Sequence, residues 1–186
     1  AWAKQDAMTP LDVGNINSLI RSYLLSLTFE KKAKSTQKEY KRMLTELEKT
    51  FGKMPVKALA SPKVKGVFLD YQEEIGRDRP READNRLSVL SAVFAYATRR
   101  GEIVGNPLEG FERVYSVDRS EIIWTESDIQ KFMTGAAVEL QRVLILAIHT
   151  GQRYGDLIRL RWSDYDGASI SLVQSKGKVR LTVPCS

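Results

Sequence analysis

The sequence contains little of what disulfide frameworks and metal centres require. Cys185 is the one cysteine and His149 the one histidine among 186 residues. An internal disulfide needs two thiols and a cysteine-cluster zinc site needs several, so the sequence excludes both. We expect Cys185 to be a small apolar strand residue. No apolar run approaches the roughly 18 residues of a membrane span and no signal peptide is visible, so we expect a cytoplasmic protein.

Acidic residues are also in the minority, with 23 against 29 basic ones and a net charge of +6. Residues 1–115 carry 20 basic and 15 acidic side chains, whereas residues 116–186 carry 9 and 8, so the excess lies in the first part. A basic surface favours a polyanionic partner, although it also occurs in proteins that bind nothing acidic. The hydrophobic content of 42% is enough for a packed core.

Apolar periodicity predicts four amphipathic helices in the first part of the chain. The first covers residues 15–29, and a capping box from Thr36 to Glu39 starts the second. Ser61 and Pro62 start a third, and the fourth covers residues 81–99. Four such helices with short loops form a small bundle. The expected inward face of the third helix comprises Val64, Val67, Phe68, Tyr71 and Ile75.

The last third of the chain predicts helices followed by a β-hairpin. Thr125 is the expected N-cap of a first helix, and residues 143–148 are apolar nearly all round, as in a buried helix. Gly151 suits the left-handed position that ends this helix, and Arg153 then opens a short one. Apolar and polar residues alternate on both sides of residues 175–178, which indicates a hairpin. Trp162 is expected to take part in core or domain packing, and His149 is expected to cap a helix.

Two positive side chains in this region have no evident structural role. Arg153 is rooted beside a buried helix, and a rigidly held guanidinium matches phosphate oxygens bidentately. Lys176 lies at the hairpin tip, from which it could deliver a charge or a proton. The alternatives are a helix-start salt bridge between Arg153 and Asp156 and a solvated hairpin lysine, and Lys178 competes with Lys176 for the same role.

These residues carry a resemblance to a known family. The run from Thr150 to Asp164, with Gly151, Arg153, Asp156, Leu157, Leu160 and Trp162, followed by Lys176 and then Val183 and Pro184, resembles the tyrosine recombinases, or phage integrases. The first part is similar to the family's core-binding domain in Ser35, Thr36, Tyr40, Phe51, Gly52, residues 83–86, Asn106 and Pro107.

The resemblance implies a mainly α fold. A four-helix, SAM-like core-binding bundle would cover residues 1–112, and a charged linker would cover residues 113–123. Part of an α+β catalytic domain, with helices and a β-hairpin, would cover residues 124–186. The chain starts at Ala1, and the His-x-x-Arg segment and the tyrosine nucleophile of the family have no counterpart in it. We therefore expect a piece of an integrase that is inactive alone. Part of the apolar surface of residues 143–148 and of the hairpin should be exposed in it, or covered by another chain.

The resemblance also implies site residues and partners. Arg153 matches the first catalytic arginine, Asp156 a supporting acid, and Lys176 the general acid, in a reaction without metal or other cofactor. The expected partners are double-stranded DNA and other copies of the integrase, with no membrane and no small-molecule substrate. The alternative for each basic residue is that it lies on a solvent-exposed helix face and binds no partner. The predicted DNA-binding residues are Lys34, Thr36, Lys38, Lys41, Arg42, Arg81, Asn85 and Arg86.

The leading hypothesis is site-specific DNA recombination or integration of the phage or prophage type. In the family, strands are cut and rejoined through a 3′-phosphotyrosine intermediate. One alternative is a non-catalytic DNA-binding module, a shortened integrase that occupies sites or competes with the full enzyme. Another is a helical protein-interaction domain whose basic surface has no nucleic-acid partner.

Overall fold

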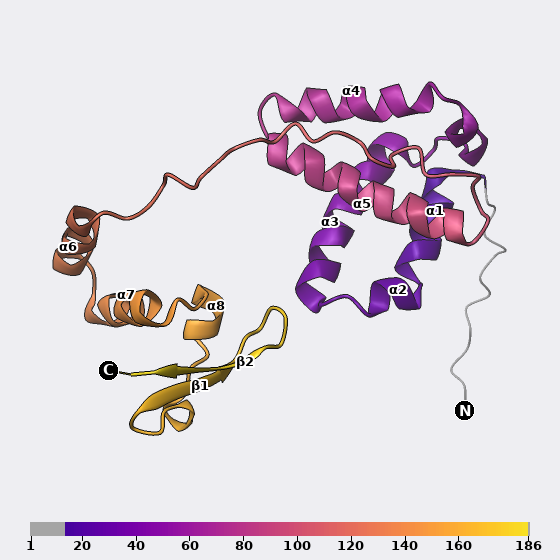
Figure 1. Ribbon diagram of the computed structural model, residues 1–186. Coiled ribbons are helices and arrows are strands. Elements are labelled where there is room, and N and C mark those ends of the chain that lie inside the picture. The colour runs from indigo at the N-terminus through magenta and orange to yellow at the C-terminus, as the bar shows by residue number, and fades with distance from the viewer. Residues whose placement is uncertain (1–13, 186) are drawn as a thin grey trace, which may run out of the picture. The chain divides into compact units, whose positions relative to one another are not determined.

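The computed structural model describes residues 14–185, and the chain divides into two compact units between Val117 and Asp118. Both units are rich in helices, and one two-stranded sheet lies in the second (Figure 1). The prediction of a mainly α fold with a β-hairpin is thus confirmed. Within the described residues, no helix has the length and apolar character needed to cross a membrane.

Unit 1, the part up to Val117, packs its helices around α5 (Pro80–Arg99). The helix α4 (Val64–Gly76) runs beside α5, and α1 (Ile16–Leu24) and α3 (Lys34–Phe51) also pack against it (Figure 1). Two short elements complete the unit, α2 (Leu27–Glu30) and the 3-10 helix η1 (Val56–Ala60). The apolar stripes of the long helices meet in one core because each helix has only one apolar face to bury.

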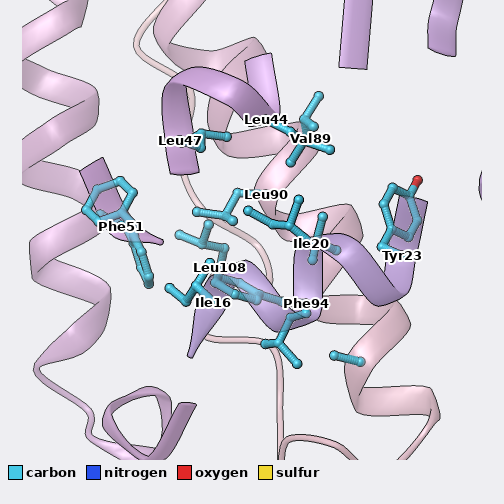
Figure 2. Packing of buried hydrophobic residues seen from close by; sticks show 14 of the residues in the cluster. Ile16, Ile20, Tyr23, Leu44, Leu47, Phe51, Val89, Leu90, Phe94 and Leu108 are labelled. Carbon is cyan, nitrogen blue, oxygen red and sulfur yellow. The ribbon is translucent and has the colours of Figure 1, made fainter. Parts of the chain in front are cut away.

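The core of unit 1 combines aromatic and aliphatic side chains from its helices (Figure 2). Phe68 and Phe94 are fully buried, and their rings lie 5.6 Å apart, while Phe51 lies edge-on to Phe68 at 5.0 Å. Leu108 follows the last helix of the unit and is also fully buried. The loop after α5 therefore returns to the core, and Asn106 fastens it by donating to the backbone and hydroxyl oxygens of Ser91.

The first predicted helix, over residues 15–29, is wrong as one continuous element. The helix α1 ends at Leu24, and Ser26 caps a separate helix by accepting the N–H of Phe29. A serine side chain that bonds the backbone competes with helix continuation, which explains the break. Leu27, which lies within the predicted helix, is 69% exposed as a result.

Two further local predictions in unit 1 are wrong. The helix α3 begins at Lys34 without a side-chain cap, so Thr36 forms no capping box. Gln37 instead donates to the carbonyls of Glu30 and Lys32, which ties the start of α3 to the end of α2. Val67 was expected to face inward but is 45% exposed.

Unit 2, from Asp118 onward, contains α6 (Glu126–Gly135), α7 (Val138–Thr150) and α8 (Tyr154–Leu157). The 3-10 helix η2 (Trp162–Asp164) leads to the antiparallel pair β1 (Ser169–Val173) and β2 (Arg180–Pro184). Within the hairpin Ile170 faces Val183 and Leu172 faces Leu181. The predicted hairpin is confirmed.

Both predicted helix ends in unit 2 are also confirmed. Thr125 forms a capping box with Asp128 at the start of α6. Gly151 ends α7 at φ 62° in the left-handed region, where glycine meets no Cβ penalty.

Part of the apolar surface of unit 2 is exposed, as expected for a piece of the domain. No residue of α7 is buried, and Ile145 and Ile148 on its surface are about half exposed. Trp162, expected in core or domain packing, is 91% exposed and so is not part of the core. An apolar pattern states which residues gain from burial, but not which neighbours are present to cover them.

Candidate functional site

The predicted site residues fall into two sets, one in each unit. Arg153, Asp156 and Lys176 belong to unit 2, where α7, α8 and the hairpin position them. The eight predicted DNA-binding residues belong to unit 1, on α3 and on the first turns of α5.

Arg153 stands at the start of α8, immediately after the turn that ends α7. Its carbonyl accepts the N–H groups of Asp156 and Leu157 at 2.8 and 3.0 Å, so its backbone is fixed by the first turn of the helix. The side chain is exposed, and within residues 14–185 it forms neither a hydrogen bond nor an ion pair. The alternative of a salt bridge to Asp156 is therefore not formed, and the guanidinium stays available for a ligand.

Asp156 connects α8 to the hairpin tip rather than to Arg153. Its Oδ1 accepts the backbone N–H of Ser175 at 2.8 Å and Nη2 of Arg159 at 2.9 Å, and the residue is 4% exposed. The N–H of Ser175 is the main cause that lowers the pKa of this carboxyl, and Arg159 adds to it. Oδ2 is buried and has no partner among the described residues.

The turn that carries Arg153 is fastened to the turn that carries Lys176 at two points. The bond from Ser175 to Asp156 is the first, and the second runs from Nε2 of Gln174 to Oε1 of Gln152 at 2.9 Å. Gln152 directly precedes Arg153, and Ser175 directly precedes Lys176. Arg153 and Lys176 lie 23 positions apart in sequence, and these two hydrogen bonds hold the turns that carry them together.

The two candidate lysines of the hairpin tip differ in surroundings. Both are exposed, but Lys178 has φ 56°, a left-handed conformation that is uncommon outside glycine. Lys178 also lines a cavity of about 520 Å³ together with Arg159 and Arg180, whereas Lys176 does not line it.

In unit 1, three lysines form a stripe along α3. Lys34, Lys38 and Lys41 follow each other at i, i+4 and i+7, which places them on one helix face, and all three are exposed. We call these three residues the α3 basic stripe. Nζ of Lys41 lies 5.9 Å from the ring centroid of Phe29. Thr36 follows Lys34 by two positions, so it lies on the opposite side of the helix from the stripe, where it is half-buried.

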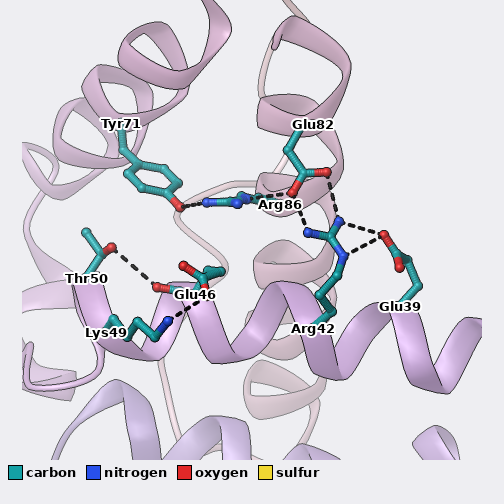
Figure 3. Close-up of polar contacts among 8 residues, drawn as sticks. All are labelled: Glu39, Arg42, Glu46, Lys49, Thr50, Tyr71, Glu82 and Arg86. Carbon is teal, nitrogen blue, oxygen red and sulfur yellow. Dashed lines mark hydrogen bonds and ion pairs between the residues drawn. The ribbon is translucent and has the colours of Figure 1, made fainter. Parts of the chain in front are cut away.

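Arg42 and Arg86 have partners inside the protein (Figure 3). Arg42 donates to both carboxylate oxygens of Glu82 at 2.9 Å and to Glu39 at 2.6 Å. Arg86 is 8% exposed, and it donates to Glu82 and to the hydroxyl of Tyr71, both at 2.9 Å. The network joins α3, α4 and α5. The sequence analysis predicted that Arg42 and Arg86 bind DNA, but in the structure their guanidinium groups donate to side chains of unit 1.

Arg81 and Asn85 line a cleft at the start of α5. The cleft has a volume of about 470 Å³ and is also lined by Arg42, Arg79, Pro80, Glu82 and Tyr115. The guanidinium of Arg81 lies 5.7 Å from the ring centroid of Tyr115, within cation–π range. We call this feature the α5 cleft.

Sequence reasoning missed Asp84 and the segment that it binds. Asp84 is 4% exposed, and it accepts the backbone N–H groups of Val114 and Tyr115, both at 3.0 Å. These bonds hold residues 114 and 115 to α5, and both residues belong to unit 1. The signal was present in the pattern, since Asp84 precedes Leu87 by three positions and so lies on the apolar face of α5. A carboxylate there requires hydrogen-bond partners.

Comparison with known proteins shows relatives among phage integrases. No family model matches the chain. Over 134 residues, or 71% of the chain, it is 31% identical to the integrase of Escherichia phage HK022, of which it covers 38%. It is 29% identical over 99 residues to the integrase of Enterobacteria phage 434, covering 52% of this chain and 28% of that protein. The chain therefore spans well under half the length of the curated relatives that it matches.

Solved structures share the fold. A lambda integrase tetramer bound to a Holliday junction matches 91% of this chain and 48% of its own, with a TM-score of 0.76 and 23% identity. The Tn1549 transposon integrase in complex with a circular intermediate DNA matches 93% of this chain and 58% of its own, with a TM-score of 0.67 and 16% identity. At these identities, the likeness establishes a common fold.

Proposed function

The chain belongs to the tyrosine recombinase family of phage integrases, and we propose that it binds double-stranded DNA in site-specific recombination. Unit 1 would serve as the core-binding domain, up to Val117, and unit 2 would supply part of the catalytic domain. Other copies of the integrase would bind the same DNA, and the reaction would take place in the cytoplasm.

The observation that carries the proposal is the α3 basic stripe. Lys34, Lys38 and Lys41 share one exposed helix face, and within the described part of the chain they have no carboxylate partner. Unpaired ammonium groups along a helix suit the phosphates of a duplex, because each contact releases condensed counterions. Integrases of this fold have been solved in complex with DNA, which supports a DNA-binding role for this chain.

In unit 2, we propose Arg153 and Lys176 as the residues that contact the reacting phosphate. Arg153 offers an exposed guanidinium on a fixed backbone, which suits stabilisation of the charge that develops on the phosphorus. Lys176 would protonate the leaving oxygen. Asp156 would support both residues indirectly, because it holds the hairpin tip beside α8 through Ser175.

The test is a fluorescence anisotropy titration of duplex DNA at several salt concentrations. The triple substitution of Lys34, Lys38 and Lys41 by Gln should weaken binding to all sequences. It should also flatten the dependence of log affinity on log salt by up to about three units, one for each lost phosphate contact. The matched control replaces Lys53, Lys57 and Lys63 by Gln, since these exposed lysines follow the other end of α3.

The control changes the net charge by the same amount. Equal losses of affinity in the two triple variants would therefore mean that the overall charge, and not the α3 basic stripe, determines the affinity. Absence of any salt-dependent DNA binding by the unaltered chain would refute the proposed function and favour a protein-interaction domain. For unit 2, Lys176→Ala should weaken photocrosslinking of the hairpin to DNA more than Lys178→Ala. The reverse order would assign the role to Lys178.

A further inference from the structure

A buried polar clasp holds the end of unit 1 against α4 and α5. Gln72, which is 2% exposed, donates through Nε2 to Oδ1 of Asp84 at 2.7 Å and to the carbonyl of Glu112 at 2.9 Å. Asp84 in turn accepts the N–H groups of Val114 and Tyr115. Three of these hydrogen bonds fix the segment 112–115, and the fourth, from Gln72 to Asp84, joins α4 to α5.

The segment is also closely packed from the α4 side. A Cβ atom added at Gly76 would lie 3.2 Å from a methyl group of Val114. The clasp therefore places Tyr115 at a defined position, and its half-buried ring forms a wall of the α5 cleft.

The charges that line the α5 cleft are not balanced. Arg42 and Glu82 neutralise each other through their bidentate pair. Arg79 and Arg81 are exposed, and neither has an ion-pair partner within residues 14–185. Asn85 adds an exposed amide that can donate. Two free guanidinium groups and an amide around a cavity suit a phosphate, which accepts several charge-assisted bonds at once.

We propose that the α5 cleft binds a backbone phosphate of DNA and that Asp84 is a positioning residue, which acts by holding Tyr115 under Arg81. The stacked ring restricts the guanidinium, so less side-chain entropy is lost when Arg81 meets the phosphate. Occupancy of the cleft and order of the segment 112–115 are then coupled. The inference rests on the proposed DNA-binding function and adds a specific site to it.

The experiment combines DNA affinity with amide hydrogen exchange in the full chain. Arg81→Gln should weaken duplex binding several-fold and lower the salt slope by about one. The control is Arg77→Gln, because Arg77 is exposed in the connection that leads into α5 but does not line the cleft. Saturating DNA should slow exchange at the Val114 and Tyr115 amides of the unaltered chain, and the slowing should be smaller in Arg81→Gln.

Tyr115→Leu keeps the backbone bonds of the clasp and removes the ring, so it should weaken DNA binding without unfolding unit 1. Because Asp84 acts through Tyr115, Asp84→Asn should weaken binding in the unaltered background but add nothing to Tyr115→Leu. Additive losses would mean that Asp84 has a merely structural role. Exchange at the Leu90 amide reports whether each variant retains the folded core.

The outcomes separate this inference from the function on which it rests. If the unaltered chain binds no DNA, the proposed function fails. If it binds DNA, but Arg81→Gln and Arg77→Gln have equal affinity and salt slope, the cleft is not a phosphate site and the DNA-binding function stands. If Arg81→Gln weakens binding but DNA leaves exchange at Val114 and Tyr115 unchanged, the coupling is refuted.

Discussion

Glu82 is the shared acceptor of the ion-pair network in unit 1, and Glu82→Gln tests what the network contributes to stability. The carboxylate accepts one N–H from Arg86 and two from Arg42, all at 2.9 Å (Figure 3). The substitution preserves shape but removes the charge. It leaves the guanidinium of Arg86, whose side chain is only 10% exposed, beside a neutral amide.

The two arginines should contribute unequally. The Arg42 side chain is 46% exposed, and pairs at such positions are screened by water and contribute at most about 1 kcal/mol. Hydrogen bonds to a charged and largely buried group contribute about 1.5–3 kcal/mol. We therefore expect Glu82→Gln to lower the free energy of unfolding of unit 1 by roughly 2–3 kcal/mol. A double-mutant cycle should give Glu82 a larger coupling energy with Arg86 than with Arg42.

The same carboxylate predicts a pH dependence. Bidentate hydrogen bonding from Arg42 is the main cause that holds the pKa of Glu82 below its ordinary 4.5, and bonding from Arg86 adds to it. A carboxyl whose pKa is lowered by folding contributes stability that is present above the ordinary value and is lost as the pH falls through the folded-state value. The stability difference between the unaltered chain and Glu82→Gln should therefore be full at neutral pH and shrink below about pH 4.5.

The assay is amide hydrogen exchange at Leu90 and Phe94, which are fully buried on α5 and report opening of unit 1. The control is Glu39→Gln, because Glu39 is half exposed and bonds only to Arg42 among the residues of the network. Its effect should be clearly smaller. Equal losses from Glu82→Gln and Glu39→Gln, or a difference that does not change with pH, would refute the reasoning.

Three further predictions concern unit 2. Gly151→Ala should lower the stability of unit 2 by about 1 kcal/mol in urea unfolding, because an L side chain is strained at φ 62°; no loss would contradict the left-handed helix end. Asp156→Ala should speed exchange at the Ser175 amide and loosen the hairpin tip, unless another acceptor fixes that turn. In the unaltered chain, amides of residues 90–97 should exchange more slowly than those of residues 170–183, because unit 1 has the larger buried core; equal rates would contradict this.

The sequence by itself determined the type and order of most elements. Apolar residues that recur every three or four positions gain free energy only on one face of a helix, so α1, α3, α4 and α5 were visible without the fold. The left-handed helix end at Gly151 and the N-cap at Thr125 are local features, since the bonds that form them lie within four residues, and both were predicted. The run around Arg153 and the hairpin with Lys176 were also local, which is why the family could be recognised.

The tertiary structure alone decided which polar groups meet. Arg42 and Glu82 lie 40 positions apart, and Asp84 lies 30 and 31 positions from the amides of Val114 and Tyr115. Such pairs depend on how α3, α4 and α5 pack, and a charge pattern along one helix does not contain that information. In the structure, Arg42 and Arg86 bind the carboxylate of Glu82, and Tyr115 lies under Arg81. Polar groups that become buried need hydrogen-bond partners, and the packing of the helices decides which partners are within reach.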